Sequence, residues 1–327
     1  MTHSTAETRL EMRPFMADDY AVVASIHNAN YAPDFSRDAD KLRFEDATRP
    51  AHCRAERWVA EIDGRVVGFG EYDQHASLYH PRKFEIHFAV DPAFVGRGIA
   101  TRLYDQVMRA LEPFEPLSIG AWGRADMLPL IGFLQRRGFV ADMRLWLSSL
   151  DLTTFDVRPY KSLEAAIDAQ GIHIRSLADL GAADPAVRRK IYDLWLEVRM
   201  DVPIPPGEVR TEVSFDVFSE RLDGPDFLAA GYLVATAGDD YVGMSQLWLA
   251  PEPEVLRTGL TAVRRAYRRR GLALALKVRA LEVARRQGYQ QVFTENESNN
   301  RGMLAINERL GFQKYPAWDH YVKSLAG

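Results

Sequence analysis

Two short segments combine glycine and arginine in a pattern that suits phosphate binding. Residues 90–103 read VDPAFVGRGIATRL, and residues 263–276 read VRRAYRRRGLALAL. Each segment is predicted to contain the end of a strand, a turn and the start of a helix. The first amides of a helix lack partners within the helix, and the helix dipole adds partial positive charge there. Either turn could therefore hold an anion such as a pyrophosphate.

The two turns differ in charge and in glycine content. Three arginines precede Gly271 in the second turn, whereas two glycines flank Arg97 in the first. A glycine at such a position allows a ligand to approach the backbone closely or permits a positive φ. The residues predicted to bind a phosphate-containing cofactor are Val263, Arg268, Arg269, Arg270, Gly271, Leu272 and Ala273 in the second segment, and Val90, Gly96, Arg97, Gly98, Ile99 and Ala100 in the first.

The two segments belong to a longer internal repeat. Val90 aligns with Val263 at an offset of 173 residues, and the same offset carries Gly138 onto Gly311. Two sites this far apart would rarely share one gapless register by chance, so we infer a duplication. We expect a first domain at residues 8–150, a linker at 151–170 without clear periodicity, and a second domain at 171–327.

The elements around each turn are predicted from hydrophobic periodicity and turn residues. Both units begin with a strand, a helix and a hairpin, and continue as a strand, the turn, a helix, a strand and a short helix. The ranges in the first unit are 10–14, 18–29, 57–62, 65–72, 84–90, 98–111, 116–121, 128–137 and a closing strand at 139–150. Those in the second are 172–175, 185–200, 232–237, 241–249, 257–263, 271–287, 291–295 and 303–310. Each unit is therefore predicted to be a mixed α/β fold.

Composition excludes several classes of protein. The 327 residues are 47% hydrophobic and 26% charged, as in ordinary globular proteins, and the net charge of −4 argues against nucleic-acid binding. A single cysteine, Cys53, rules out an intramolecular disulfide and disfavours a cysteine-based metal site, so we expect no metal. We see no secretory signal and no membrane-length apolar run, and we expect a cytoplasmic protein that does not bind membranes.

Sequence features beyond the turns resemble one family. The pattern V-x-x-x-[FY]-[RQ]-x-x-G-x-[GA] at a strand–helix junction resembles the GCN5-related N-acetyltransferases (GNAT). Residues 294–312, TENESNNRGMLAINERLGF, look like the asparagine-bearing strand, helix and L-G-F terminus of that family. Residues 133–139, FLQRRGF, look like the same terminus in the first unit. The resemblance implies two tandem GNAT-like domains that cover nearly the whole chain outside the linker.

The resemblance also implies a cofactor and a reaction. Acetyl-CoA would be the acetyl donor, with its pyrophosphate on the glycine–arginine turn and its pantetheine between strands 257–263 and 291–295. The family's polar asparagine positions correspond to Asn296 and Asn300, which would contact this cofactor. Alternatively, these two residues form only a turn and a helix N-cap. The amine of a small molecule would attack the thioester directly, in a monomer or homodimer. Nothing in the sequence identifies that acceptor.

Several residues depart from the family pattern. Asn307 and Leu134 occupy the positions where the family often has a tyrosine acid, and Val95 replaces the Arg or Gln of the first loop. Glu85 and His87 alternate with apolar residues, so both should point to one face of their strand, where related enzymes often place a base. We predict these two as catalytic residues; alternatively, they are a solvent-facing pair.

Three functional hypotheses remain open at this stage. The leading one is a small-molecule N-acetyltransferase. A second is a module that binds CoA without turning it over, and a third has one catalytic copy and one degenerate copy that shapes the acceptor cleft. Release of free thiol with a panel of amines separates the first two, because a sensor would bind CoA and release none. Nucleic-acid binding through the local arginine cluster is the weakest option.

Overall fold

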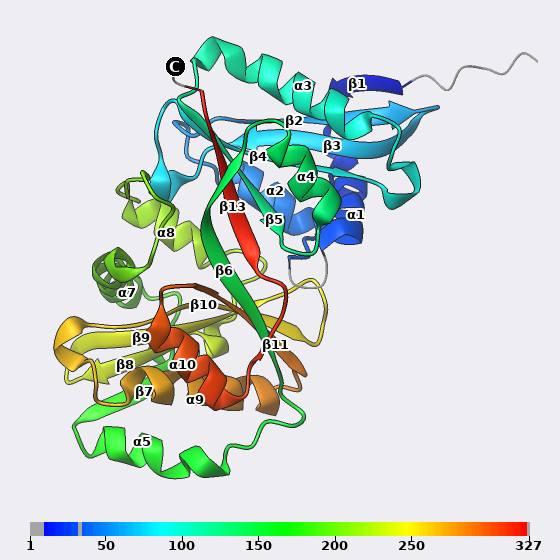
Figure 1. Cartoon of the computed structure of the whole chain (residues 1–327). Helices are drawn as coiled ribbons and strands as arrows, with labels where there is room; N and C mark the ends of the chain where they lie inside the picture. Colours follow the sequence, from blue (N-terminus) through cyan, green and yellow to red (C-terminus); the bar gives the residue numbers. More distant parts are fainter. Residues whose placement is uncertain (1–9, 32–34, 326–327) are drawn as a thin grey trace, which may run out of the picture.

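A computed structural model describes residues 10–31 and 35–325 of the chain, and its elements follow the two sequence units (Figure 1). The first unit contains β1 (Leu10–Pro14), α1 (Tyr20–Tyr31), α2 (Ala39–Ala47), β2 (Ala55–Ile62), β3 (Arg65–Asp73), β4 (Lys83–Val90), α3 (Ile99–Leu111), β5 (Ser118–Arg124), α4 (Leu128–Gln135) and β6 (Val140–Asp151). The second contains β7 (Ile172–Ser176), α6 (Leu177–Leu180), α7 (Pro185–Val198), α8 (Phe215–Arg221), β8 (Leu233–Ala237), β9 (Asp240–Leu249), β10 (Val255–Val263), α9 (Leu272–Arg286), β11 (Gln291–Glu297), α10 (Arg301–Leu310), β12 (Gln313–Lys314) and β13 (Trp318–Ser324).

The structural repeat follows the sequence repeat closely. β5 and β11 begin and end 173 residues apart, as do the first residues of α3 and α9 and of α4 and α10. The mixed α/β prediction for each unit is confirmed. Helices α2, α6 and α8 and strands β12 and β13 lie outside the predicted elements. The predicted domain boundaries remain a prediction.

The linker contains a helix that the sequence did not reveal. Residues Lys161–Asp168 form α5, which packs on α9 and β7. Its Ile167 is buried in the core of the second unit, and Leu163 packs against that core. These two residues are four apart and share one helical face, but eight residues are too few for a clear periodic signal.

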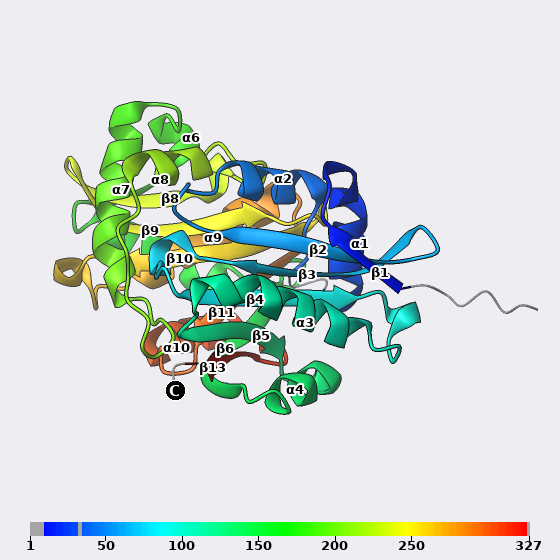
Figure 2. The ribbon, with the colours of Figure 1, turned by 90° about the horizontal axis from the view of Figure 1, so that it is seen from above.

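Helices cover both faces of the sheet in the first unit. α3 lies on one face of β2–β4, and α1 and α2 lie on the other (Figure 2). Ile99, Leu103, Val107 and Leu111 of α3 are almost completely buried, as their spacing of four predicts. In the second unit α9 packs in the same way on β8–β10. Across the described part of the chain, no helix has both the length and the apolar character that a membrane span requires.

The strands of both units join into one 13-stranded sheet because each unit gives a strand to the other. β13, from the end of the second unit, lies between β5 and β6 of the first. β6, from the end of the first unit, pairs with β11 of the second. Figure 1 shows these two long strands side by side where the halves of the molecule meet. The predicted closing strand at 139–150 thus leaves its own unit and pairs with the other.

The exchange follows the symmetry of the repeat. Leu145 pairs with Trp318, its own counterpart at the offset of 173, so an approximate twofold axis passes between these two residues. Trp318 also pairs with Arg124 of β5. Leu145 likewise pairs with Glu297 of β11, which is the counterpart of Arg124 at the same offset. The two strands are therefore reciprocally exchanged, and neither unit has a complete sheet without the other.

One hydrophobic cluster belongs to both units. It joins Val59 and Phe69 of the first unit with Phe293 of the second, and includes Leu147 and Trp318 from the exchanged strands. All five side chains are buried. Complete burial of an apolar side chain contributes about 1.5–3 kcal/mol, so this shared core ties the stability of one unit to that of the other.

His320 on the exchanged strand β13 bonds two carboxylates of the first unit. Its Nε2 lies 3.0 Å from Oε1 of Glu85 on β4, and its Nδ1 lies 2.6 Å from Oδ1 of Asp142 on β6. Burial by itself favours the neutral ring, but the hydrogen bonds and charges of the two carboxylates outweigh it and raise the pKa of His320 to about 9. His320 is therefore positively charged at neutral pH.

This ion-paired histidine should make stability fall as pH rises. The pKa is 6.5 in the reference state and about 9 in the folded protein, so the folded state retains a proton across this window. The stabilisation is complete below the lower value and is lost as pH rises through the upper one; it amounts to at most about 3 kcal/mol. Urea unfolding of the wild type and His320→Asn across the window measures this contribution. An identical pH dependence in both proteins would contradict it.

Candidate functional site

A cavity of about 1100 Å³ begins at the turn before α9 and extends to the boundary between the units. Its walls come from β10, β11, α9, α10 and the segment after α7, together with Phe35, Ser77, Leu78 and Trp122 of the first unit. All the cofactor-binding residues predicted in the second unit, except Arg270, line it. These are Val263, Arg268, Arg269, Gly271, Leu272, Ala273, Asn296 and Asn300.

The turn before α9 has the backbone of an anion-binding site. Gly271 has φ 82° and Arg269 has φ 62°, so two left-handed residues, two positions apart, follow the extended Arg268 just before the helix. Such a turn directs successive N–H groups into one concave site. Gly96 and Gly98 adopt the same left-handed conformation in the first unit. At the position of Gly96, the second unit has Arg269 in the same left-handed conformation. A non-glycine residue pays about 1–2 kcal/mol in backbone strain there.

The arginines of this turn are tied to the segment after α7. Asp201 accepts a 2.6 Å hydrogen bond from Arg265 and a second, shorter one from Arg268. These hydrogen bonds lower the pKa of Asp201 to about 2. Arg270, in contrast, lies over the ring of Tyr267 and bonds the carbonyl of Ala266.

Strands β10 and β11 separate to admit a ligand between them. They pair only at residues 255–257 and 291–293, and a 2.6 Å hydrogen bond between Thr258 and Thr294 marks the point where they diverge. On the other edge of β10, Gly259 and Leu260 oppose the single residue Gln246 of β9, which forms a β-bulge. A Cβ at Gly259 would lie 2.4 Å from Oε1 of Gln246, so only glycine fits. The bulge places the backbone of both residues in the cavity wall.

The asparagines of the second unit serve structural roles as well as lining the cavity. The Asn300 side chain accepts a 3.3 Å hydrogen bond from the Met303 amide and caps α10. Asn296 is buried, and its amide donates to Thr294 at 3.4 Å. Asn307, at the position of the family's tyrosine, is 3% exposed, and neither polar atom of its side chain has a hydrogen-bond partner among the residues that the structure describes.

Three cavity residues were missed by the sequence analysis. Lys277 on α9 is 2% exposed, and its ammonium lies 5.2 Å from the centre of the Phe312 ring. Burial lowers the pKa of Lys277 to about 7. Arg199 and Arg210 line the opposite end, beside the first unit. The run LALALKVRALEVA does contain a signal, because its lysine interrupts an otherwise apolar helical face.

The equivalent site in the first unit is filled. β4 and β5 also diverge after residues 85 and 120, but Glu85 and His320 bridge the gap between them. A Cβ at Gly120 would lie 2.0 Å from Oε1 of Glu85. β4 pairs with β3 without a bulge. The residues predicted at this turn line neither the large cavity nor a smaller one beside α10; they are Val90, Gly96, Arg97, Gly98, Ile99 and Ala100.

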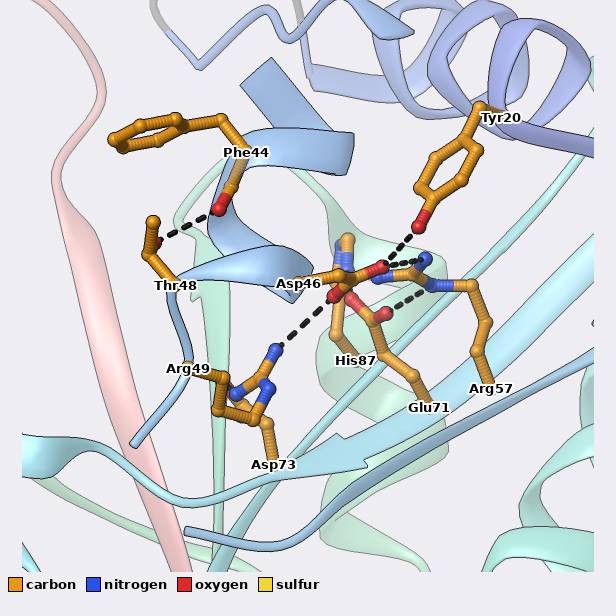
Figure 3. A network of polar contacts seen from close by, with 9 residues as sticks. All are labelled: Tyr20, Phe44, Asp46, Thr48, Arg49, Arg57, Glu71, Asp73 and His87. Carbon is orange, nitrogen blue, oxygen red and sulfur yellow. Dashed lines mark hydrogen bonds and ion pairs between the residues drawn. The ribbon is translucent and has the colours of Figure 1, made fainter. Parts of the chain in front are cut away.

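The two predicted catalytic residues lie away from the cavity and belong to separate polar networks. His87 Nδ1 lies 3.2 Å from Oε1 of Glu71, which pairs with Arg57 at 2.5 Å, and Arg57 also bonds Asp46 (Figure 3). Burial lowers the pKa of His87, although Glu71 opposes this shift. Glu85 bonds His320, as described above. A catalytic role for Glu85 and His87 therefore stays a prediction.

The fold and cavity define a tandem α/β protein with a glycine–arginine turn of anion-binding geometry and a cleft between separated strands. The Acetyltransferase (GNAT) family matches residues 20–139 and again residues 191–312. The chain therefore belongs to the GNAT family of acetyltransferases, as a member with two tandem domains. Comparison with curated proteins gave no match.

Solved structures with the same tandem fold cover almost the whole chain. A tandem GNAT protein from the clavulanic acid biosynthesis pathway has a TM-score of 0.74 at 17% identity and covers 98% of this chain and 99% of its own. A GCN5-related N-acetyltransferase from Sphaerobacter thermophilus has a TM-score of 0.71 at 17% identity, covering 97% and 96%. A glucosamine N-acetyltransferase region of a fungal multi-domain β-N-acetylglucosaminidase has a TM-score of 0.68 at 14% identity, covering 98% and 38%. At these identities the likeness establishes the fold.

Proposed function

We propose that the second unit binds acetyl-CoA and transfers the acetyl group to the amine of a small molecule. The observation that supports this most strongly is the continuity of the cavity. It runs from the phosphate-binding turn, past the gap between β10 and β11, to a chamber walled by the first unit. A long, anionic thioester substrate and a separate acceptor can enter such a cavity from opposite ends. We expect the protein to act in the cytoplasm as a monomer or homodimer.

The residues of the second unit suit the donor substrate. The amides after Gly271 and the side chains of Arg268 and Arg269 would hold its pyrophosphate, and the gap between β10 and β11 would hold its pantetheine. When bound, acetyl-CoA supplies an activated acyl group that a neutral amine can attack directly. The chain must then orient the amine, remove its proton and protonate the departing thiolate.

The first unit would act as a wall of the acceptor chamber and not as a second active site. Its Phe35, Ser77, Leu78 and Trp122 line the cavity of the second unit. Its own strand gap is occupied by Glu85 and His320. This arrangement favours one catalytic copy and one copy that shapes the acceptor cleft.

Two measurements on the purified chain test this function. Calorimetric titration with acetyl-CoA should show one binding site per chain. Release of free thiol in the presence of a broad amine panel should then exceed hydrolysis without amine. Binding of acetyl-CoA without amine-dependent thiol release would favour the alternative, a module that binds CoA but does not turn it over. Absence of binding would exclude both.

Lys277 is our candidate for the proton donor in place of the family's tyrosine. It lines the cavity, is buried, and has a pKa near neutrality, so it can give up a proton at physiological pH. We expect Lys277→Met to lower kcat about 100-fold or more while acetyl-CoA affinity changes little, because proton transfer typically contributes 10²–10⁴ in rate.

The matched control for this variant is Lys314→Met. Lys314 is half-exposed and pairs with Glu308 outside the large cavity, so its loss should leave kcat unchanged. A weaker acetyl-CoA affinity in Lys277→Met, with normal kcat at saturation, would instead make Lys277 an anchor for the cofactor.

A further inference from the structure

A buried arginine lies in the wall of the acceptor chamber and bonds two backbone carbonyls. Arg199, at the end of α7, is 5% exposed and lines the cavity. Its guanidinium donates to the backbone carbonyls of Thr211, at 3.3 Å, and Ser77, at 3.2 Å, and stacks over Trp195. These two bonds leave most of its five N–H donors for other partners. No ion pair involves Arg199 within residues 10–31 and 35–325.

A second arginine lines the same chamber close to the first. Arg210 is half-buried and donates one short hydrogen bond to the carbonyl of Val202. Burial, and then the positive charge of Arg199, lower the pKa of Arg210. Burial likewise lowers the pKa of Arg199, against a smaller opposing effect of Tyr192. The two arginines thus line one cavity, and Arg199 bonds the carbonyl of Thr211, the residue after Arg210. Partly desolvated cations in one place are costly without an anion near them.

Two carboxylates of the segment after α7 are already paired with other cations. Asp201 is bonded to Arg265 and Arg268 at the cofactor turn. Glu208 pairs with Lys83 of the first unit at 2.9 Å. Neither is in ion-pair contact with Arg199 or Arg210 within the part of the chain that the structure describes. A ligand that carries an anion could therefore supply the counter-charge.

We propose that the acceptor is an amine that also carries a carboxylate or phosphate group, which Arg199 and Arg210 bind. This inference rests on the proposed function and names its class of acceptor. The planar guanidinium matches the paired oxygens of either anion, and partial burial strengthens the interaction. The two arginines come from the segment after α7, which contacts residues 76–79 of the first unit, whereas the cofactor turn lies at the start of α9. The anion would thus anchor one end of the acceptor and leave its amine to reach the thioester.

Matched pairs of amines test the proposal. The full chain, saturated with CoA so that the cofactor turn is occupied, is titrated with glycine and glycinamide, with O-phosphoethanolamine and ethanolamine, and with glucosamine 6-phosphate and glucosamine. At least one anionic member should bind about 10- to 100-fold more tightly than its neutral mate. Arg210→Gln should abolish this preference, and Arg210→Lys should retain part of it. Arg189→Gln removes an exposed charge on α7, outside the cavity, and should change nothing.

Several results would overturn the proposal. These are equal binding within every pair, no binding by any anionic member, or a preference that survives in both Arg210→Gln and Arg199→Gln. A loss of CoA affinity in Arg210→Gln, with the amine preference intact, would assign the arginines to the cofactor instead. If the protein binds no CoA, the proposed function fails independently of the proposal for the two arginines. The same amine titration of the free protein then still decides whether these arginines bind an anion.

Discussion

Replacing Gly271 by valine should abolish acetyl-CoA binding, with a loss of affinity of more than about 100-fold. Gly271 has φ 82°, a conformation that a β-branched residue rarely adopts, and it immediately precedes α9. Valine would force the turn to rearrange, and the amides that converge on one anion would then diverge. Several charge-assisted hydrogen bonds would be lost together. Calorimetric titration of the folded variant with acetyl-CoA measures the effect.

The repeat provides a matched control for this substitution. Gly98 has φ 75° and precedes α3 in the same way, so Gly98→Val introduces comparable backbone strain of about 1–3 kcal/mol. Because the first turn lines no part of the cavity, acetyl-CoA affinity should stay within about twofold of the wild type. If Gly98→Val abolishes binding and Gly271→Val does not, the cofactor site is in the first unit.

Replacing Trp318 by alanine should destabilise both units together, by about 3–5 kcal/mol. Trp318 is 4% exposed, pairs with Leu145 at the approximate twofold axis, and packs against the ring of Phe35 at 4.6 Å. Its loss would leave a cavity in the core that the units share. Urea unfolding followed both by circular dichroism and by loss of acetyl-CoA binding should show one transition in each protein, shifted to lower urea in the variant.

Trp146 is the matched control for Trp318. It lies on the other exchanged strand, but its ring is only partly buried and faces Arg144 and Lys314. Trp146→Ala should therefore cost less than half as much. Two separate transitions in the Trp318 variant, with acetyl-CoA binding retained after the first, would show that the second unit is stable without the shared core.

Local features made the fold of each unit predictable from sequence. Each signal lies within a short stretch of sequence. Examples are the glycine–arginine turns, which predict a strand–helix junction, and the spacing of four that predicts the helix with Ile99, Leu103, Val107 and Leu111. The duplication then doubled each signal, because an element found in one unit is expected at the same offset in the other. The turn before α9, which we propose holds the cofactor, was predicted in this way.

The strand exchange and the acceptor chamber could not be predicted in the same way. The alternating pattern of 139–150 identifies a strand and its buried face but not its neighbour, and β5 and β11 are equally good partners by symmetry. Arg199 and Arg210 appear in the sequence as ordinary charged residues, because their contacts come from tertiary structure, including Ser77 of the other unit for Arg199. Glu85 was recognised as a polar residue on a strand, but its partner His320 lies 235 residues away.

The exchange of β6 and β13 imposes an order on folding during synthesis. The first unit cannot close its sheet when its own segment leaves the ribosome, because β13 lies more than 160 residues beyond β6. At about 5–20 residues per second, it must wait roughly 8–33 s with the edge of β5 unpaired. An exposed strand edge is a template for association with other chains. Nascent chains of this protein should therefore depend on chaperones that shield the first half until the second is made.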